Sequence, residues 1–314
     1  MGILDWVVLI FSIGFIVLYG IWKNIKNKDL QEYFKGSNKS RWWTIGISVM
    51  ATQASAITFL STPGQAYSDG MGFIQFYFGL PFAIIIISIF FLPIYHKLKV
   101  YTAYEFLEKR FNKKTRNLAS LLFLIQRGLA AGITIYAPAI IMSLILKWPL
   151  YLLIIIIGSL VTFYTLIGGT KAVNVTQKQQ MFVIFIGLFI TIYYIFKGIP
   201  KEFSLNEVLE IAGANGKLDI LNFDLDFKSR YTFWSGITGG LFLALSYFGT
   251  DQSQVQRYIS GKNLRESQKG LFFNAILKVP MQFLILFIGV SVFVFYQFNL
   301  SPINFNTAAL EKVR

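Results

Sequence analysis

Eight long apolar segments follow one another along this chain of 314 residues, and they constrain its fold more than any other feature. A helix needs roughly 20 apolar residues to cross the hydrocarbon core of a bilayer. The predicted spans are 4–22, 42–67, 73–95, 118–146, 149–167, 181–196, 233–249 continuing to 258, and 272–295. The expected fold class is an all-α polytopic membrane protein with about eight transmembrane helices.

Composition supports this class and excludes others. Only 14% of the residues are charged, whereas soluble domains carry about 25%, which argues against a soluble enzyme, a nucleic-acid binder or a disordered regulator. Cysteine is absent, so disulfides and thiolate metal sites are excluded. The single histidine, His96, is expected at the membrane interface without a ligand role. No H-E-x-x-H motif or intramembrane carboxylate pair indicates a membrane-embedded enzyme.

The basic residues predict the orientation. Nineteen lysine and arginine residues lie in the loops after spans one, three, five and seven, against six in the loops on the other side. Basic loops stay in the cytoplasm, so the N-terminus is predicted outside. The net charge of +14 is therefore a topology signal, and no nucleic-acid partner is expected.

The loop 199–231 on the opposite side is rich in acidic residues. Ser204 to Glu207 has the pattern of a capping box, which predicts a short external helix ending between Gly213 and Gly216. A plain solvated loop is the alternative.

Two spans are interrupted by polar residues. In the segment Ala51–Thr58 the centre of span two is small and polar, which predicts an unwound stretch whose carbonyls bind an ion. A helix-contact face is the alternative. Span seven has Asp251 after Gly249, which predicts a second break; the alternative is a helix that ends at Gly249 with Asp251 in the interface. Paired interruptions in two halves are typical of inverted-repeat transporters with a site at the midplane.

Two further basic residues lie inside predicted spans. Lys278 either extends to the cytoplasmic face or pairs with a polar group near the site. Arg127 precedes a small-residue motif, Gly128 to Gly132, which predicts close helix packing rather than a chemical role.

Four strings carry a resemblance to a known family: 101–111 (YTAYEFLEKRF), 164–173 (YTLIGGTKAV), 249–258 (GTDQSQVQRY) and 269–280 (KGLF through KVP). In this order they resemble the sodium:solute symporter family, which includes sodium/glucose, proline, iodide and sialic acid cotransporters. The resemblance implies a LeuT-like fold with an extra N-terminal helix and two inverted five-helix repeats. One transporter domain, 1–314, would then comprise the extra helix (1–22), the first repeat (42–198), an external loop with a short helix (199–231) and the start of the second repeat (232–314).

The resemblance also implies the ion site. The carbonyls of Ala51 and Ala54 would bind sodium, with further ligands from a Ser-x-x-Ser-Ser cluster on an eighth core helix. That helix would follow Arg314, so an incomplete, C-terminally truncated member is expected. Gln177 stands where some members carry an acid that contributes to a second sodium site, and because it is neutral we expect one coupled sodium.

The resemblance implies the substrate residues as well. The positions that match the family's pocket are Thr58, Gln75 or Tyr77, Tyr247 near an inner gate, and Lys278, with Asp251 and Gln252 as further functional residues in the second break.

The expected function is sodium-coupled secondary active symport of a small organic solute by alternating access. Thr58, Gln75 and Tyr77 can hydrogen-bond hydroxyl groups, which favours a sugar or polyol. Sodium is the coupling ion and no other cofactor is expected; the other partners are the solute and the lipid bilayer. An Ile-, Lys- and Phe-rich chain without cysteine fits a bacterial inner membrane. The alternatives are a channel and a transporter-fold sensor with a signalling domain beyond Arg314.

Overall fold

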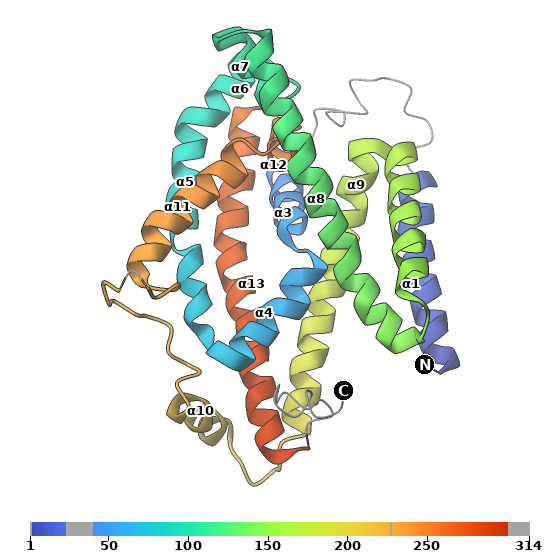
Figure 1. The fold of residues 1–314 in the computed structure, drawn as a ribbon, viewed down its shortest axis with the longest axis vertical. Coiled ribbons are helices and arrows are strands. Elements are labelled where there is room, and N and C mark those ends of the chain that lie inside the picture. Colours follow the sequence, from blue (N-terminus) through green and yellow to red (C-terminus); the bar gives the residue numbers. More distant parts are fainter. Residues whose placement is uncertain (1, 23–39, 227, 301–314) are drawn as a thin grey trace.

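The computed structural model describes residues 2–22, 40–226 and 228–300, and all of the regular elements in these ranges are helical (Figure 1). Five of the basic residues used to orient the chain lie in 23–39, outside the described residues, as does the stretch 301–314 of the expected second repeat. An isolated parallel bridge joins Ser40 to Gly261.

The helices follow the predicted segments. In chain order they are α1 (Ile3–Trp22), α3 (Trp42–Gln53), α4 (Ala56–Asp69), η1 (Met71–Tyr77), α5 (Gly79–Ile86), η2 (Ile87–Phe91), α6 (Leu92–Leu98), α7 (Ala103–Arg110), α8 (Lys113–Leu146), α9 (Leu150–Lys197), α10 (Leu205–Ala214), α11 (Phe233–Gly249), α12 (Gln252–Ile259) and α13 (Leu264–Phe298). Within the described residues, four helical stretches are long and apolar enough to cross a membrane, or five if the bent pair α3 and α4 is one span. It stays a prediction that three further segments cross the membrane: α1, the first arm of α9, and α11.

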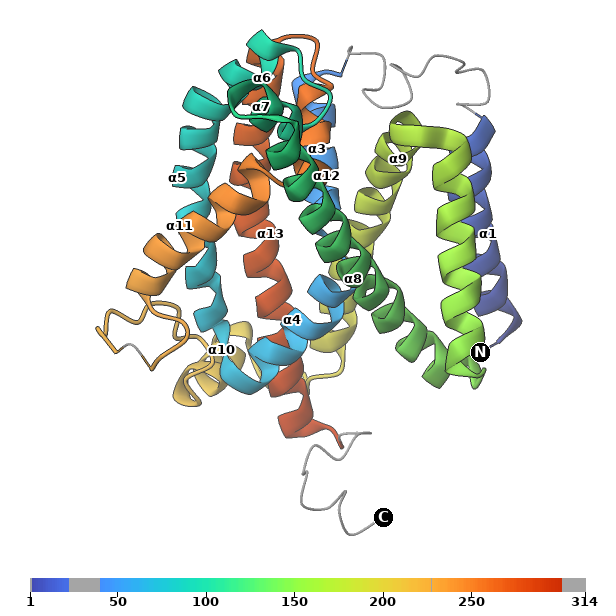
Figure 2. The ribbon, with the colours of Figure 1, turned by 45° about the horizontal axis from the view of Figure 1, so that its top comes forward.

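Helix α9 contains two of the predicted spans. It folds back on itself, so that its first arm lies beside α1 and its second arm approaches α3 (Figure 2). The turn lies between the apolar stretches 149–167 and 181–196, where the sequence changes to glycine and polar residues.

A closely packed bundle of α3, α4, α5, α11 and α13 forms the centre of the molecule. Glycines allow its backbones to approach. A Cβ on Gly240 of α11 would lie 2.4 Å from the Phe76 carbonyl oxygen, and one on Gly289 of α13 would lie 2.1 Å from that of Pro63 in α4. By contrast, nothing in the described structure lies within 4 Å of a Cβ on Gly128 or Gly132 of α8. The prediction of close packing at that motif is therefore wrong.

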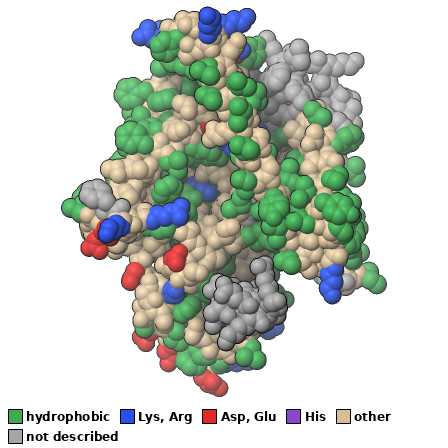
Figure 3. Space-filling view, viewed as in Figure 1, with side chains coloured by type: hydrophobic (Ala, Val, Ile, Leu, Met, Phe, Trp, Pro, Cys, Tyr) green, Lys and Arg blue, Asp and Glu red, His purple; other side chains and the backbone are tan. Residues whose placement is uncertain are grey.

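The short helix predicted in the loop 199–231 is confirmed as α10, and its capping box is formed, while its position outside the membrane stays a prediction. The Ser204 hydroxyl accepts from the Glu207 amide, and the Glu207 carboxylate accepts from the Ser204 amide at 2.6 Å. These hydrogen bonds hold the pKa of Glu207 below its usual value. On the face drawn in Figure 3, Lys and Arg gather at the α6–α7 end, and most Asp and Glu lie toward the α10 end, as the predicted orientation requires.

The close approach of α11 to η1 can be tested with two glycine substitutions at neighbouring positions of α11. Gly240→Ala should lower the midpoint of thermal unfolding in detergent, because overpacking against a backbone costs about 1–3 kcal/mol. Gly239→Ala, at the next position of the same helix, meets nothing within 4 Å in the described structure and should leave the midpoint unchanged or raise it. Equal effects of the two substitutions would contradict the described contact.

Candidate functional site

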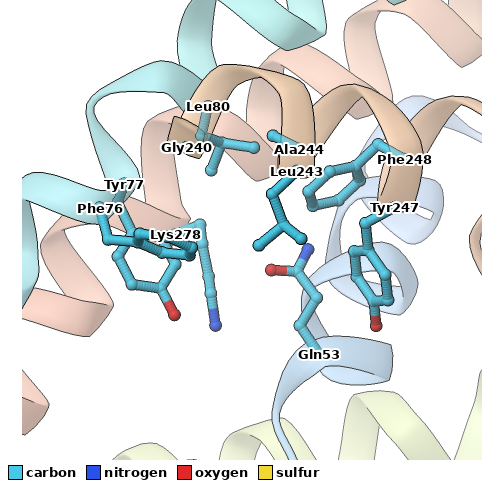
Figure 4. A pocket seen from close by; sticks show the side chains of 10 residues that line it. All are labelled: Gln53, Phe76, Tyr77, Leu80, Gly240, Leu243, Ala244, Tyr247, Phe248 and Lys278. Atoms are coloured by element: carbon cyan, nitrogen blue, oxygen red, sulfur yellow. The ribbon is translucent and has the colours of Figure 1, made fainter. Parts of the chain in front are cut away.

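A cavity of about 290 Å³ lies at the centre of the bundle. It is lined by Gln53, Phe76, Tyr77, Leu80, Gly240, Leu243, Ala244, Tyr247, Phe248 and Lys278. Figure 4 shows Lys278 and Tyr77 on one side of the open space, with Gln53 and Tyr247 on the other. The side chains come from α3, η1, α5, α11 and α13, so the packing of the bundle creates the site.

The first break borders this cavity. Helix α3 ends at Gln53 and α4 begins at Ala56, with a bend of 62° between the two helices. The backbone hydrogen bonds at the break are local: Ala54 donates to the Ala51 carbonyl at 3.0 Å, and Ser55 donates to the Gln53 carbonyl at 3.0 Å. The predicted interruption is confirmed, and the binding of sodium by Ala51 and Ala54 stays a prediction.

The side chain of Gln177 approaches the first break from α9. Its Oε1 accepts from the Ser48 hydroxyl at 2.7 Å, and its Nε2 donates to the Thr52 hydroxyl at 3.1 Å. Both hydroxyls lie on the last turns of α3. The neutral amide therefore forms a direct contact between α9 and the helix that ends at the cavity.

The second break has its carbonyls capped by other elements. Helix α11 ends at Gly249, whose carbonyl accepts from the Tyr95 hydroxyl at 2.8 Å. The Phe248 carbonyl accepts from the Tyr258 hydroxyl at 2.9 Å. Since buried backbone groups need partners, these two buried tyrosines stabilise the break.

Asp251 lies in the second break and is 9% exposed. One of its oxygens caps α12 by accepting from the amide and the hydroxyl of Ser253, at 2.9 and 2.7 Å. The other oxygen forms an ion pair with Arg127 of α8. Helix α11 does end at Gly249, as the alternative assumed, and Asp251 is buried and paired; its depth in the membrane stays a prediction.

Arg127 joins α8 to the second break through its side chain. Besides its ion pair with Asp251, its guanidinium lies 5.6 Å from the centre of the Tyr247 ring, a cation–π distance. His96, expected to have no ligand role, forms a hydrogen-bond contact of 3.1 Å with Ser267 of α13.

Lys278 is 1% exposed, and its ammonium lies 5.7 Å from the centre of the Tyr77 ring. It does not extend to the cytoplasmic face, so that alternative is wrong. The ion pairs in the described part of the chain are Arg116–Glu108 and Arg127–Asp251, which leaves Lys278 without a carboxylate there. Its neighbours one turn away on α13, Asn274 and Gln282, are fully buried amides without hydrogen-bond partners in the described structure.

Comparison with known proteins identifies the family. The model of the sodium:solute symporter family matches residues 33–312. The chain belongs to the sodium:solute symporter family. It is 34% identical over 267 residues to the sodium-coupled monocarboxylate transporter 2 of Bos taurus, and 29% identical over 280 residues to the sodium/iodide cotransporter of Homo sapiens. These matches cover 85% and 88% of this chain but 43% of each relative, so the chain spans less than half the length of these curated relatives.

A solved structure of a Na⁺-coupled sialic acid symporter, in a substrate-bound outward-open state, has the same fold with a TM-score of 0.90 and 28% sequence identity. The similarity covers 98% of this chain and 66% of that one. The expected fold class is therefore confirmed. The family is one of transporters, which excludes the membrane-embedded enzyme.

Within this symporter fold, the structure brings three of the predicted substrate residues to the cavity: Tyr77, Tyr247 and Lys278. Thr58 is not among the lining residues, and its hydroxyl donates to the Gln53 carbonyl at 3.2 Å. Sequence reasoning missed Gln53, whose Nε2 is buried without a partner in the described structure. Its place inside the interrupted stretch Ala51–Thr58 was the signal that could have identified it.

Gln75 and Gln252 lie elsewhere and hold loops. Gln75 is buried; its Oε1 accepts from the Asn222 amide at 2.9 Å, and its Nε2 donates to the carbonyls of Gly72 and Tyr231, both at 3.2 Å. The Gln252 amide oxygen accepts from the Ala103 amide at the start of α7 at 2.9 Å, and its Nε2 donates to the Tyr101 carbonyl at 3.1 Å. Of the two alternatives Gln75 and Tyr77, the structure brings Tyr77 to the cavity.

The contacts of Gln75 predict that substituting it lowers the stability of the protein and leaves the binding of the solute unchanged. Gln75→Leu should lower the unfolding midpoint, since each buried backbone group left without its partner costs about 1–3 kcal/mol. The affinity of the folded protein for its solute should stay unchanged, as measured by equilibrium binding. A loss of affinity with an unchanged midpoint would instead make Gln75 a substrate ligand.

Proposed function

We propose that this chain contains the central cavity of a sodium-coupled symporter that transports a small organic anion by alternating access. The observation that carries the proposal is Lys278, a buried ammonium group that faces the cavity and has no carboxylate partner in the described structure. Multi-pass insertion in a membrane follows from the family and the apolar helices, and we place the chain in a bacterial inner membrane on composition.

A buried charge is expensive unless an opposite charge compensates it. An anionic solute in the cavity supplies that charge beside Lys278, while the apolar ring faces of Phe76 and Phe248 can contact a short carbon chain. The names of the similar proteins agree with an anion, because they specify monocarboxylates and iodide. They give no support to the sugar or polyol favoured from the sequence, which becomes the competing outcome of the test.

The sodium ion is proposed to bind at the first break. Carbonyl oxygens are ligands suited to hard cations, and those of Ala51 and Ala54 lie where α3 loses its regular pattern. A sodium ion there would be drawn inward by the membrane potential, which contributes about 2.3 kcal/mol per charge per 100 mV. Coupling requires that sodium and solute favour the same conformational state, typically by about 1–3 kcal/mol.

The domain assignment is proposed on the same basis. The extra helix is α1, the first repeat runs from α3 through α9, and α11 begins the second repeat, so that the two breaks occupy equivalent places in the two repeats. In that arrangement the bundle moves against α8 and α9. A sensor built on this fold would bind the solute at the same cavity without net uptake.

The substrate class is tested by uptake into proteoliposomes with an inward sodium gradient, using a labelled short monocarboxylate, iodide, sialic acid and a neutral sugar. An anion should accumulate and the sugar should not. Lys278→Met should reduce the uptake at least about tenfold, since it removes the compensating charge. Lys269→Met, the same change at an exposed position of α13, should have no effect. Sugar accumulation that survives Lys278→Met would contradict the proposal.

The number of coupled sodium ions is a second test. Because Gln177 is neutral and its amide contacts Ser48 and Thr52, one sodium per cycle is expected. A titration of uptake against sodium concentration should give a Hill coefficient of about one. A coefficient clearly above one would show that a second sodium binds without the acid.

A further inference from the structure

We propose that Arg127 is a positioning residue: with Asp251 it forms a charge latch that closes the cavity on the side of α12, and breaking the pair accompanies opening toward that side. The inference rests on the proposed alternating-access function. It adds a residue that acts through others, since Arg127 does not line the cavity itself.

The latch joins elements that otherwise pack with different neighbours. Helix α8 packs mainly on α7, α9 and α4, whereas α11 and α12 pack within the bundle on α5, η1, α3 and α13. The Arg127–Asp251 ion pair therefore connects α8 to the second break through side chains. Figure 1 shows α12 toward the end of the molecule that carries α6 and α7, the basic end predicted to face the cytoplasm.

The two oxygens of Asp251 have separate tasks. One accepts both hydrogen bonds from Ser253 and moves with α12, because donor and acceptor lie at the same helix terminus. The other binds Arg127 across to α8. A displacement of α12 relative to α8 would leave the cap intact and break only the ion pair, as a reversible closure requires.

Arg127 also contacts the wall of the cavity. Its guanidinium lies over the ring of Tyr247, and Tyr247 lines the cavity four residues before Asp251. The Nε of Arg127 is buried without a partner in the described structure. The ion pair with Asp251 and the contact with the Tyr247 ring therefore place Arg127 between the second break and the cavity wall.

Electrostatics gives the direction of the effect. In the closed arrangement Asp251 is 9% exposed, so a carboxylate without Arg127 would lack a compensating cation in a place that water hardly reaches. Opening toward α12 admits water, which solvates both groups. Loss of the guanidinium therefore destabilises the closed state more than the open state and shifts the equilibrium toward opening.

The absence of native cysteine makes accessibility the direct measurement. Ala244 lines the cavity, so Ala244→Cys reports how fast a membrane-impermeant thiol reagent reaches it from the cytoplasmic side of oriented vesicles. In this background, Arg127→Gln and Asp251→Asn should each raise the labelling rate by about fivefold or more. Asparagine caps helices about as well as aspartate, so Asp251→Asn removes the charge and keeps the cap.

Two controls separate a latch from general loosening. Arg116→Gln makes the same change on the same helix and breaks the Arg116–Glu108 pair, yet it should leave the rate unchanged. Arg127→Lys keeps the charge and should restore most of the slow rate. The proposal is overturned if neither Arg127→Gln nor Asp251→Asn changes the rate, or if Arg116→Gln raises it equally. Labelling needs no solute, so an absence of uptake would count against the proposed function and not against the latch.

Discussion

The structure depends on a constraint of the bilayer: a helix inside hydrocarbon must satisfy its own backbone, and a helix that stops midway leaves groups that something else must satisfy. Two helices of this chain end inside predicted spans, at Gln53 and at Gly249. At the second break the hydroxyls of Tyr95 and Tyr258 supply donors from other elements. At the first break the backbone hydrogen bonds come from the break itself, which is why we assign the cation there.

Close packing brings the two breaks to one cavity. Gly240 lets α11 approach η1, and Gly289 lets α13 approach α4 at Pro63. With the backbones this close, Lys278 of α13 and Gln53 of α3 face the same space. The cavity thus brings a cationic side chain to the same space as the end of α3, where we propose the sodium ion. A sodium ion at the first break and the Lys278 ammonium would repel each other, and an anion in the cavity would attract both, which is a physical reason why the binding of sodium and solute should be coupled.

Patterns local in sequence predicted much of the fold. The lengths of the apolar segments predicted the helices. The polar stretch Ala51–Thr58 predicted the first break, and the capping pattern of Ser204 and Glu207 predicted α10. Such local patterns do not predict contacts between residues that are far apart in the sequence. Nothing near Arg127 indicates a carboxylate 124 positions away, and nothing near Gln75 indicates that its amide holds the external loop. Side-chain identity suggested a site at Gln75, and only the three-dimensional neighbours showed a loop contact instead.

Linkage between sodium and solute is the central claim, and equilibrium binding tests it most directly. The affinity of the purified protein for a labelled monocarboxylate should be measured in sodium and in potassium at equal ionic strength. We predict higher affinity in sodium, and by reciprocity the solute should raise the affinity for sodium by the same factor. Equal affinity in the two salts would contradict a cation site at the first break that is coupled to the cavity.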